Sequence, residues 1–437
     1  MIPWPYAILI LFGLLVFFMA LSTPVAFAFM LTCFIGSILF WGGPDMLAVS
    51  IYSSVTSFVF LPIPLFILMG CILFESGVGA LIVDTLDRLM GRIPARLSVV
   101  TIIAGALLGA MIGISGSSIA ILGKTLFPEM LKRGYKNPVT LGPVVITGTL
   151  AIMIPPSALA VFLGAMGKVS IGKLLIAIIV PGVLVAILSI GYVLLRVNLN
   201  PSLAPSYQVR PIPLKEKLSL ICRYLLPSGI VIFAAIGSIF FGIASPSEAS
   251  ALGAVACFVV AALYRKFSLG MVKRASLATV EITSMVLMIV VGAISFSRIL
   301  ASSGAMTGLI EFAKSLPVSP MVIVVATQII VVFMGCFMDP ASIVMITVPV
   351  FIPLIQALGL DPLWYSVLLL LNIQLGLITP PFGLDCYTMK ALSPPEITVE
   401  DVFRSSMPFC ALGFLVMALM MIFPSIATWL PTLMRVK

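Results

Sequence analysis

The stretch Gly148-Thr149-Leu150-Ala151-Ile152-Met153-Ile154-Pro155-Pro156-Ser157 lies inside an apolar segment that is long enough to cross a membrane. Two consecutive prolines remove two backbone donors and crowd the carbonyls of the preceding turn, so a helix cannot continue intact through them. Within a membrane, such a break is tolerated where it is buried in protein or lines a polar cavity. The freed carbonyls, with the hydroxyls of Thr149 and Ser157 beside them, are oxygen ligands of the kind that a small hard cation prefers.

A second copy of this motif argues against the simpler alternative, a proline kink that only bends a packed membrane helix. The second copy reads Asn372-Ile373-Gln374-Leu375-Gly376-Leu377-Ile378-Thr379-Pro380-Pro381-Phe382-Gly383. It belongs to a longer repeat, because matching residues recur at a constant spacing of 225 positions: Pro128 and Pro353, Gly134 and Gly359, Pro155 and Pro380, and Pro156 and Pro381. A fixed spacing of this kind indicates a duplicated structural unit.

The composition is that of a polytopic membrane protein. Of the 437 residues, 61% are hydrophobic and only 9% are charged. The mean hydropathy is +1.27, and these values exclude a soluble globular chain of this size. The net charge of +9 does not indicate a nucleic-acid partner, because the basic residues lie in short loops between apolar segments. The chain has no histidine, and its seven cysteines lack metal-ligand spacing, so we expect no zinc site and no cofactor.

Thirteen apolar segments make up most of the chain, and most are near the ~20 residues that a helix needs to cross the hydrocarbon core. They are residues 5–21, 24–41, 58–76, 97–122, 139–163, 174–196, 224–242, 247–264, 280–297, 319–337, 340–357, 363–389 and 406–430. Clusters of Lys and Arg between them mark the predicted cytoplasmic loops. These clusters are Arg88, Arg92 and Arg96; Lys132, Arg133 and Lys136; Arg196, Arg210, Lys215, Lys217 and Arg223; Arg265, Lys266, Lys273 and Arg274; and Lys390 and Arg404.

One segment is too short for the topology that its flanks require. Arg96 and Lys132 both mark the cytoplasmic side, yet the 35 residues between them are too few for two full crossings. The middle of this segment, Gly113-Ile114-Ser115-Gly116-Ser117-Ser118, is rich in helix breakers and hydroxyls. We therefore expect a re-entrant helical hairpin that enters from the cytoplasm, with residues 115–118 at its tip. The alternative is a small-residue face for helix packing.

Each half then contains three spans, a hairpin, a broken span and a closing span. Because five full crossings are an odd number, the second half must be inverted relative to the first. The sequence therefore predicts an all-α polytopic membrane fold of two inverted-topology repeats, each with about five transmembrane helices plus one re-entrant helical hairpin, and with broken helices at the membrane midplane. The loop at Gly359 carries no positive charge, as an outer loop should, whereas Arg435 and Lys437 would lie outside against that rule.

The boundaries of the predicted parts follow from this repeat. The first repeat covers residues 1–200, with its hairpin at about 97–131 and its broken helix at about 139–163; a cytoplasmic linker covers 201–222; and the second repeat covers 223–437, with its hairpin at about 319–357 and its broken helix at about 363–389. Residues 78–96 and 298–316 mix charged and apolar side chains, which predicts interfacial helices that support the hairpins.

Inverted repeats whose broken helices and hairpin tips meet near the midplane are the architecture of ion-coupled secondary transporters. Hydroxyls, an amide oxygen, freed carbonyls and a carboxylate suit Na⁺ better than a proton. The candidate Na⁺ ligands are Ser115, Gly116, Ser117, Ser118, Thr149, Gly335, Asp339, Asn372, Gly376 and Thr379. The N-termini of half-helices can face an anionic substrate. The candidate substrate contacts are Ser117, Pro156, Ser157, Arg298, Ser342, Pro381 and Gly383.

Three charged residues are candidates for a role in the site, and two of them, Asp339 and Arg298, have two interpretations. Asp339 is placed deepest in the membrane by the sequence, which favours an ion-ligand role, but it is also a suitable cap for a helix that begins at Pro340; both can hold together. Asp385 follows the second proline pair and could lie in a water-filled vestibule. Arg298 could attract a substrate carboxylate, although snorkelling at the outer interface is the favoured interpretation.

These motifs together resemble one known family. They are the hairpin motif at 113–118, both double-proline motifs, Ser245-Pro246-Ser247-Glu248-Ala249 and Met338-Asp339. Nearly the whole chain resembles the large membrane subunit of tripartite ATP-independent periplasmic (TRAP) transporters, within the ion transporter superfamily. One departure is Ala151, where the first broken helix of the family usually has a glycine, whereas Gly376 keeps it in the second.

The resemblance implies a multi-pass permease of the bacterial inner membrane. It implies two protein partners, a small four-helix membrane subunit and a periplasmic substrate-binding protein. It also implies import of small organic anions, including C4-dicarboxylates and sialic acids, driven by Na⁺ as the coupling ion through an elevator-like movement. In the family the ion sites lie around the two hairpin tips and broken helices, which correspond to the candidate positions named above.

Two alternatives remain open at this point. One is a stand-alone Na⁺- or H⁺-coupled dicarboxylate carrier of the same superfamily, which would need no binding protein. The other is a membrane-embedded enzyme with Ser115 or Ser117 as nucleophile and Lys124 as base. The absence of histidine and the scarcity of buried acids count against an enzyme, and an inverted repeat has no use in one. We therefore expect no catalytic residues, and the sequence does not identify the solute.

Overall fold

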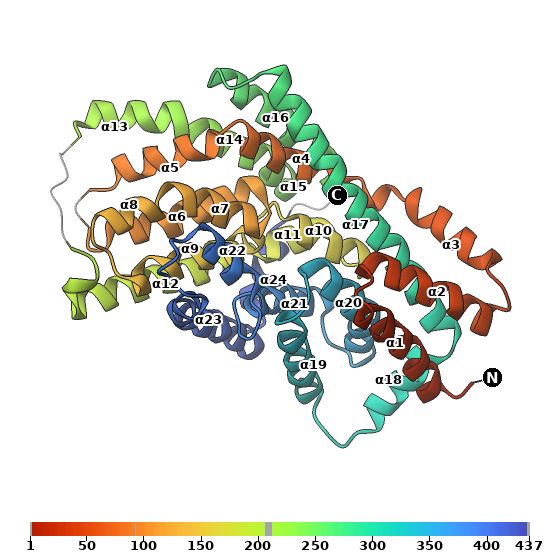
Figure 1. Cartoon of the computed structure of the whole chain (residues 1–437). Coiled ribbons are helices and arrows are strands. Elements are labelled where there is room, and N and C mark those ends of the chain that lie inside the picture. The colour runs from red at the N-terminus through yellow and green to blue at the C-terminus, as the bar shows by residue number, and fades with distance from the viewer. Residues whose placement is uncertain (1, 92, 206–211, 435–437) are drawn as a thin grey trace.

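The computed structural model describes residues 2–91, 93–205 and 212–434, and this part of the chain is helical throughout (Figure 1). Arg92, Arg210, Arg435 and Lys437 lie outside the described residues. The helices of the first half are α1 (Trp4–Ala20), α2 (Val25–Trp41), α3 (Asp45–Val55), α4 (Pro62–Glu75), α5 (Val78–Leu89), α6 (Arg96–Ile112), α7 (Ser115–Thr125), α8 (Phe127–Lys132), α9 (Leu141–Met153), α10 (Ala158–Met166), α11 (Ile171–Ala177) and α12 (Ile179–Leu199).

The second half follows with the same kinds of element. Its helices are α13 (Leu214–Leu220), α14 (Leu226–Ile232), α15 (Ser238–Phe240), α16 (Pro246–Leu263), α17 (Leu269–Ser302), α18 (Ala305–Ser315), α19 (Pro320–Gly335), α20 (Pro340–Ala357), α21 (Pro362–Gly376), α22 (Leu384–Leu392), α23 (Val399–Ile422) and α24 (Ser425–Thr432). Helix α13 begins inside the predicted linker, because no proline lies between Pro213 and Pro227 and the intervening leucines continue the apolar pattern into α14.

Seven helical runs within the described residues are long and apolar enough to cross a membrane, and an eighth arises if one bent pair counts as a single span. That pair is Asn137–Met153 with Ala158–Met166, which meet at an angle of 44° across the first double proline. In the second copy, α21 ends at Gly376 and α22 begins at Leu384, so Pro380 and Pro381 lie in the gap. The structure thus interrupts both helices where the prolines predict it. The Pro155–Pro156 and Pro380–Pro381 peptide bonds are both cis.

The interrupted helices form the centre of the molecule (Figure 1). All 13 residues of α9 are buried, and α21 is buried from Trp364 to its end. Both helices are apolar on every side, which is the pattern of a helix surrounded by protein. Helix α9 packs against α6, α7 and α23, while α21 packs against α19, α20 and α23. An outer group of helices lies against this centre. In this group α4 packs against α17, α16 packs against α4, and α2 packs against α17.

Residues 97–131 form the predicted pair of helices. Helix α6 ends at Ile112, Gly113 takes a left-handed conformation with φ of 64°, and α7 begins at Ser115. The chain returns through α7 and α8, so that Ser98 near the start of α6 lies beside Met130 near the end of α8. In the second half, α19 and α20 pack together around residues 336–339 in the same way.

The first arm of each hairpin approaches a broken helix through glycine. A Cβ atom added at Gly109 on α6 would lie 2.6 Å from the Cα of Ala151 on α9. A Cβ added at Gly376 on α21 would lie 2.6 Å from the Cα of Gly335 on α19. Small residues allow this backbone contact between membrane helices. Ala151 therefore stands in a packed contact with α6.

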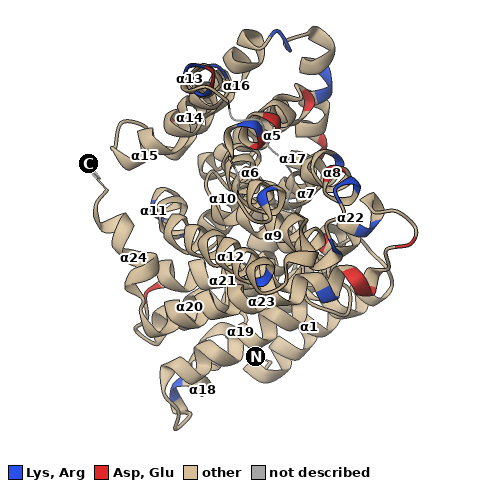
Figure 2. Cartoon of the chain, turned by 90° about the vertical axis from the view of Figure 1, so that its left-hand side faces the viewer, with Lys and Arg blue, Asp and Glu red and all other residues tan. Residues whose placement is uncertain are grey.

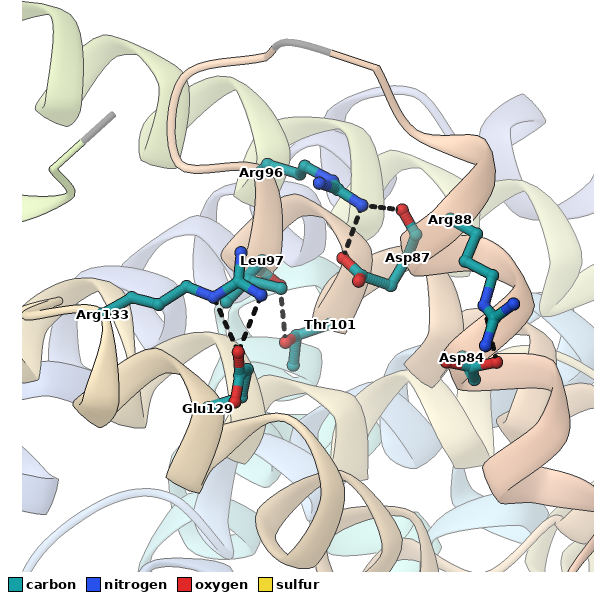
Figure 3. Close-up of polar contacts among 8 residues, drawn as sticks. All are labelled: Asp84, Asp87, Arg88, Arg96, Leu97, Thr101, Glu129 and Arg133. Carbon is teal, nitrogen blue, oxygen red and sulfur yellow. Dashed lines mark hydrogen bonds and ion pairs between the residues drawn. The ribbon is translucent and has the colours of Figure 1, made fainter. Parts of the chain in front are cut away.

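Basic residues gather at one face of the molecule. Figure 2 shows Lys and Arg on α5, α8, α13 and α22 at the face turned toward the viewer. This face corresponds to the loops that the sequence predicts to be cytoplasmic. Figure 3 shows a group of ion pairs there, with Arg96 of α6 against Asp87 of α5, and Arg133 against Glu129. The base of the first hairpin is thus attached to the amphipathic helix α5, which was predicted to support it.

We expect Arg96→Gln to lower the free energy of unfolding by about 3 kcal/mol, the lower end of the range for breaking a buried ion pair. The Arg96 side chain is 7% exposed and lies 3.0 Å from the Asp87 carboxylate, which is 25% exposed. Burial raises the pKa of Asp87 and the Arg96 charge opposes that rise, so the variant leaves a poorly solvated acid without its counter-charge. The midpoint of thermal unfolding in detergent measures the effect.

The matched control for this prediction is Arg88→Gln. Arg88 pairs with Asp84 at the same distance of 3.0 Å, but both side chains are more than half exposed, and exposed pairs contribute about 0–1 kcal/mol. Equal shifts in the two variants would contradict a stabilising role for the Arg96–Asp87 pair.

Candidate functional site

Both hairpin tips and both broken helices line one cavity of about 390 Å³. The first tip contributes residues 113–116 and the second contributes residues 339–341. Ala158 and Leu159 follow the first proline pair, while Gln374, Leu377, Leu384 and Asp385 flank the second. The remaining walls are apolar and come from α4, α10 and α17; they include Ile63, Ile67, Phe162, Ile282, Met285 and Val286. The cavity therefore lies between the central helices and the outer group.

Four helices begin at this cavity. Ser115 is the first residue of α7, and Asp339 is the N-cap of α20. Helix α10 begins at Ala158 and α22 begins at Leu384, and both of these residues line the cavity. The backbone N–H groups of a helix N-terminus carry a partial positive charge and favour an anion. Four helix N-termini thus lie at one cavity.

The closest link between the two halves is a contact from Ser115 to Asp385. The Ser115 hydroxyl donates to the Asp385 carboxylate, with its Oγ 2.6 and 2.7 Å from the two oxygens. Asp385 is only 4% exposed. Gly148 of α9 leaves room for this pair, since an added Cβ there would lie 2.6 Å from the Ser115 oxygen. Asp385 therefore lies in the wall of the site and holds the first tip against the second broken helix.

Two predicted ion ligands in the first half are buried hydroxyls that lack a partner. Ser118 and Thr149 are fully buried, and neither side-chain oxygen has a hydrogen-bond partner among the described residues. An unpaired buried oxygen is unfavourable by about 1–3 kcal/mol unless something binds to it. These oxygens fit a hard cation such as Na⁺, and the described residues contain no group of three or more Cys, Asp or Glu that would favour a transition metal.

Of the other predicted residues of the first half, Gly116 and Ser117 line two different cavities, while Pro156 and Ser157 are buried at the first proline break. Gly116 lines the main cavity, whereas Ser117 lines a smaller neighbouring one of about 190 Å³ together with Cys71 and Glu75. Ser157 is buried and caps α10, where its hydroxyl accepts from the Ala160 N–H at 3.2 Å. Pro156 is buried and its carbonyl lies beside Gly113. The first tip therefore touches the first proline pair.

Asp339 shows the predicted capping contact and also lines the cavity. Its carboxylate accepts from the Ser342 N–H at 3.1 Å and from the Ser342 hydroxyl. Ser342 itself is fully buried. The two interpretations of Asp339, a helix cap and a ligand, are therefore compatible in space.

The remaining candidates of the second half lie outside the lining of the cavity. Asn372 is buried, donates from Nδ2 to the Gln328 side chain at 2.7 Å, and leaves its own Oδ1 without a partner among the described residues. The Thr379 hydroxyl donates to the Leu375 carbonyl at 2.7 Å. Gly335 and Gly376 form the backbone contact described above. None of these residues lines the cavity itself.

None of the seven predicted substrate contacts is among the residues that line the main cavity, and three of them, Pro381, Gly383 and Arg298, lie away from it. Pro381 is exposed, and Gly383 is buried beside Phe403 with φ of 50°. Arg298 is exposed near the end of α17 and does not line the cavity. Snorkelling of Arg298 to the interface therefore stays a prediction.

The sequence argument missed Gln374. This residue is fully buried, lines the cavity, and has neither its amide nitrogen nor its amide oxygen paired among the described residues. An available signal was its place in a run between Val367 and Gly376 that is apolar apart from Asn372 and Gln374, because a polar residue inside a membrane helix indicates a functional site by default. Gln374 offers one donor and one acceptor to a bound solute.

Known proteins with similar chains are transporters or lack an assigned role. The chain is 31% identical over 435 residues to the uncharacterized protein YgiK of Salmonella typhimurium, with 98% of each chain covered. It is 28% identical to the C4-dicarboxylate TRAP transporter large permease protein DctM of Pseudomonas aeruginosa, covering 88% of this chain and 89% of that protein. It is also 28% identical to the ectoine TRAP transporter large permease protein TeaC of Halomonas elongata, with 96% of each covered.

A solved structure shares the architecture. The YdaH transporter of Alcanivorax borkumensis matches with a TM-score of 0.64 over 90% of each chain, at 16% sequence identity. At that identity the likeness shows the fold alone, that of an all-helical polytopic membrane protein.

The family is shown by a match along almost the full sequence. The family model for "Tripartite ATP-independent periplasmic transporter, DctM component" covers residues 12–426. The chain therefore belongs to the DctM family of large permease subunits of TRAP transporters, which are multi-pass proteins of the bacterial inner membrane and act as transporters rather than enzymes.

Proposed function

We propose that this permease imports a small organic acid together with Na⁺, receives the acid from a periplasmic binding protein, and moves it by an elevator-type change of access. The observation that carries the proposal is the cavity at which four helices begin. Half-helix N-termini directed at a midplane site, with unwound backbone beside them, are the usual means by which secondary transporters bind an anion and its coupling ions.

Charge balance supports coupling to cations. The cavity is lined by two carboxylates, Asp339 and Asp385, and by no Lys or Arg among the described residues. An anionic solute would add to this negative charge in a poorly hydrated space, where like charges repel strongly. Helix N-termini offset only part of it, since each carries about half an elementary charge. Bound Na⁺ supplies the remainder, and the unpaired oxygens of Ser118 and Thr149 are suited to hold it.

The proposed movement follows from where the cavity lies. One side is built from the hairpins and broken helices, and the other from Ile63 and Ile67 of α4 and from Ile282, Met285 and Val286 of α17. Aliphatic side chains form no directional bonds across this boundary, so the central group can slide against α4 and α17. We propose that the two halves are inverted repeats whose central parts move together, which exposes the cavity to each side in turn.

The proposed partners are a small four-helix membrane subunit and a periplasmic substrate-binding protein. Support comes from the isethionate TRAP transporter permease protein DctMQ of Oleidesulfovibrio alaskensis, which is 25% identical over 95% of this chain but only 65% of its own length. The rest of that relative has room for a second subunit. The names of the relatives include C4-dicarboxylate, ectoine and isethionate, so the solute here is proposed only as a small organic acid, with C4-dicarboxylates and sialic acid as the first candidates.

Uptake into proteoliposomes tests the proposal. The permease is reconstituted with its small subunit, the binding protein is added outside, and radiolabelled succinate, N-acetylneuraminate and ectoine are offered in turn. We expect one probe to accumulate under an inward Na⁺ gradient, and not under a matched K⁺ gradient. Equal accumulation under both gradients would refute Na⁺ coupling. Full activity without the binding protein would instead support a stand-alone carrier.

A further inference from the structure

A second cavity, remote from the transport site, has a strongly basic lining. It has a volume of about 590 Å³ and lies where the start of α14 meets the end of α16. Arg223, Arg265 and Lys266 line it, and no acidic residue does so within the described chain. None of the three appears in an ion pair among the described residues. Three positive charges thus face one pocket without a counter-charge from the protein.

Two tyrosines form the rest of the polar wall. The rings of Tyr224 and Tyr264 lie 5.6 Å apart, and the Tyr264 hydroxyl donates to the Tyr224 carbonyl at 3.0 Å. The Arg223 guanidinium lies 5.5 Å from the centre of the Tyr224 ring. Tyrosine is favoured at the membrane–water interface, where one end of the ring is apolar and the other is hydrated. These contacts hold Arg223 at the edge of the pocket.

The turn after α16 directs two of the cations into the pocket. Arg265 has φ of 56°, a left-handed conformation that glycine adopts easily and other residues adopt rarely. The turn is closed by hydrogen bonds from the Arg265 N–H to the Ala262 carbonyl and from the Lys266 N–H to the Ala261 carbonyl. An arginine therefore occupies the position at which a helix end usually has glycine, and it adds a charge that glycine would not.

Apolar side chains continue outward from this pocket along the same two helices. Leu263 lines the pocket and is 66% exposed. Leu226 and Ile230 of α14 are 54% and 56% exposed. Figure 2 shows α13, α14 and α16 together at one edge of the molecule. The site therefore joins a basic, hydrated pocket to a surface suited to acyl chains.

We propose that this pocket binds the phosphate group of an anionic phospholipid in the cytoplasmic leaflet. A basic pocket between membrane helices on the cytoplasmic side is the arrangement that recognises such headgroups, and Arg pairs with phosphate through two parallel hydrogen bonds. Free inorganic phosphate carries the same phosphate chemistry, but it has no apolar group that could contact the exposed leucines beside the pocket. Because α16 packs on α4, a lipid bound at this pocket would hold the outer helix group in place at the surface of the leaflet.

Lipid binding to the purified full-length chain tests this inference without any transport assay. Phosphatidylglycerol and phosphatidylcholine are titrated in detergent, and bound lipid is counted by native mass spectrometry. We expect Arg223→Gln with Lys266→Gln to weaken phosphatidylglycerol binding about 30-fold, from about 1 kcal/mol for each basic residue near the surface. Lys215→Gln with Lys217→Gln is the matched control, because it removes the same charge from α13 outside the pocket and should leave binding unchanged.

Three results would overturn the lipid assignment. They are equal binding of both lipids to the wild-type chain, equal losses in the two double variants, and binding of inorganic phosphate alone, counted in the same way, that is as tight as that of phosphatidylglycerol; the last would assign the site to a free anion. If the double variant does not give a single species in size-exclusion chromatography, Lys266→Gln alone replaces it, with an expected loss of about 5-fold. Transport of solute does not enter any of these readouts, so failure here leaves the proposed function untouched.

Discussion

Proteoliposomes that carry Asp385→Asn are expected to take up solute at the background rate of protein-free liposomes, a loss of at least about 100-fold. Asparagine keeps the size of the side chain and an oxygen that can accept from Ser115, so the shape of the wall is preserved while the charge is lost. The charge matters because no Lys or Arg among the described residues lines the cavity to balance it. In the proposed mechanism, the coupling cation balances the Asp385 carboxylate instead. Losing the partner of a buried charge costs about 3 kcal/mol or more, equivalent to roughly 100-fold.

The matched control is Asp361→Asn. Asp361 lies in the exposed loop before α21 and accepts from the Leu363 N–H at 2.8 Å. Asparagine caps helices about as well as aspartate, so uptake should match the wild-type rate. Ser115→Ala provides an intermediate case, because it removes one hydrogen bond and keeps the charge; a loss of about 10-fold is expected. Uptake by Asp385→Asn within twofold of wild type would contradict a role for this charge in coupling.

The sequence predicted the features that depend on local backbone chemistry. Proline at 155, 156, 380 and 381 cannot continue a helix, and both breaks occur there. Gly113 ends α6 in the left-handed conformation that glycine permits, which places Ser115 at the start of the returning helix. Asp339 caps α20 as the Asp-Pro order predicted. Each of these outcomes is decided within a few residues, so a single sequence contains the information.

The features that escaped prediction depend on contacts between distant segments. Asp385 and Ser115 are 270 positions apart, and no local pattern indicates that they meet. Thr379 carries a hydroxyl suited to an ion, but it does not line the cavity, and the motif alone does not reveal this. Gln374 is fully buried at the cavity wall with its amide unpaired among the described residues, which depends on how the hairpins pack and not on a local pattern. The sequence shows which side chains are polar, but only the packed structure shows which of them lack a hydrogen-bond partner.

Asp339→Asn is expected to raise the Na⁺ concentration for half-maximal uptake about 50-fold. The change separates the two roles of this residue, because asparagine can still cap α20 through the Ser342 N–H but brings no negative charge to the cavity. If Asp339 served only as a cap, the variant would behave as wild type. If it also holds a coupling cation, as proposed, loss of a charged ligand should weaken ion affinity by about 10- to 100-fold. The measurement is the initial rate of uptake as a function of Na⁺ at saturating solute.

Gln374→Leu is the companion variant that makes this result specific to the ion. Its amide lines the same cavity without a partner, so its loss should raise the solute concentration for half-maximal uptake while the dependence on Na⁺ changes little. Thr379→Ala should weaken Na⁺ dependence less than Asp339→Asn, because the Thr379 hydroxyl is neutral whereas the Asp339 carboxylate carries a charge. An unchanged Na⁺ dependence in Asp339→Asn, with normal expression, would remove Asp339 from the proposed ion site and leave it as a helix cap.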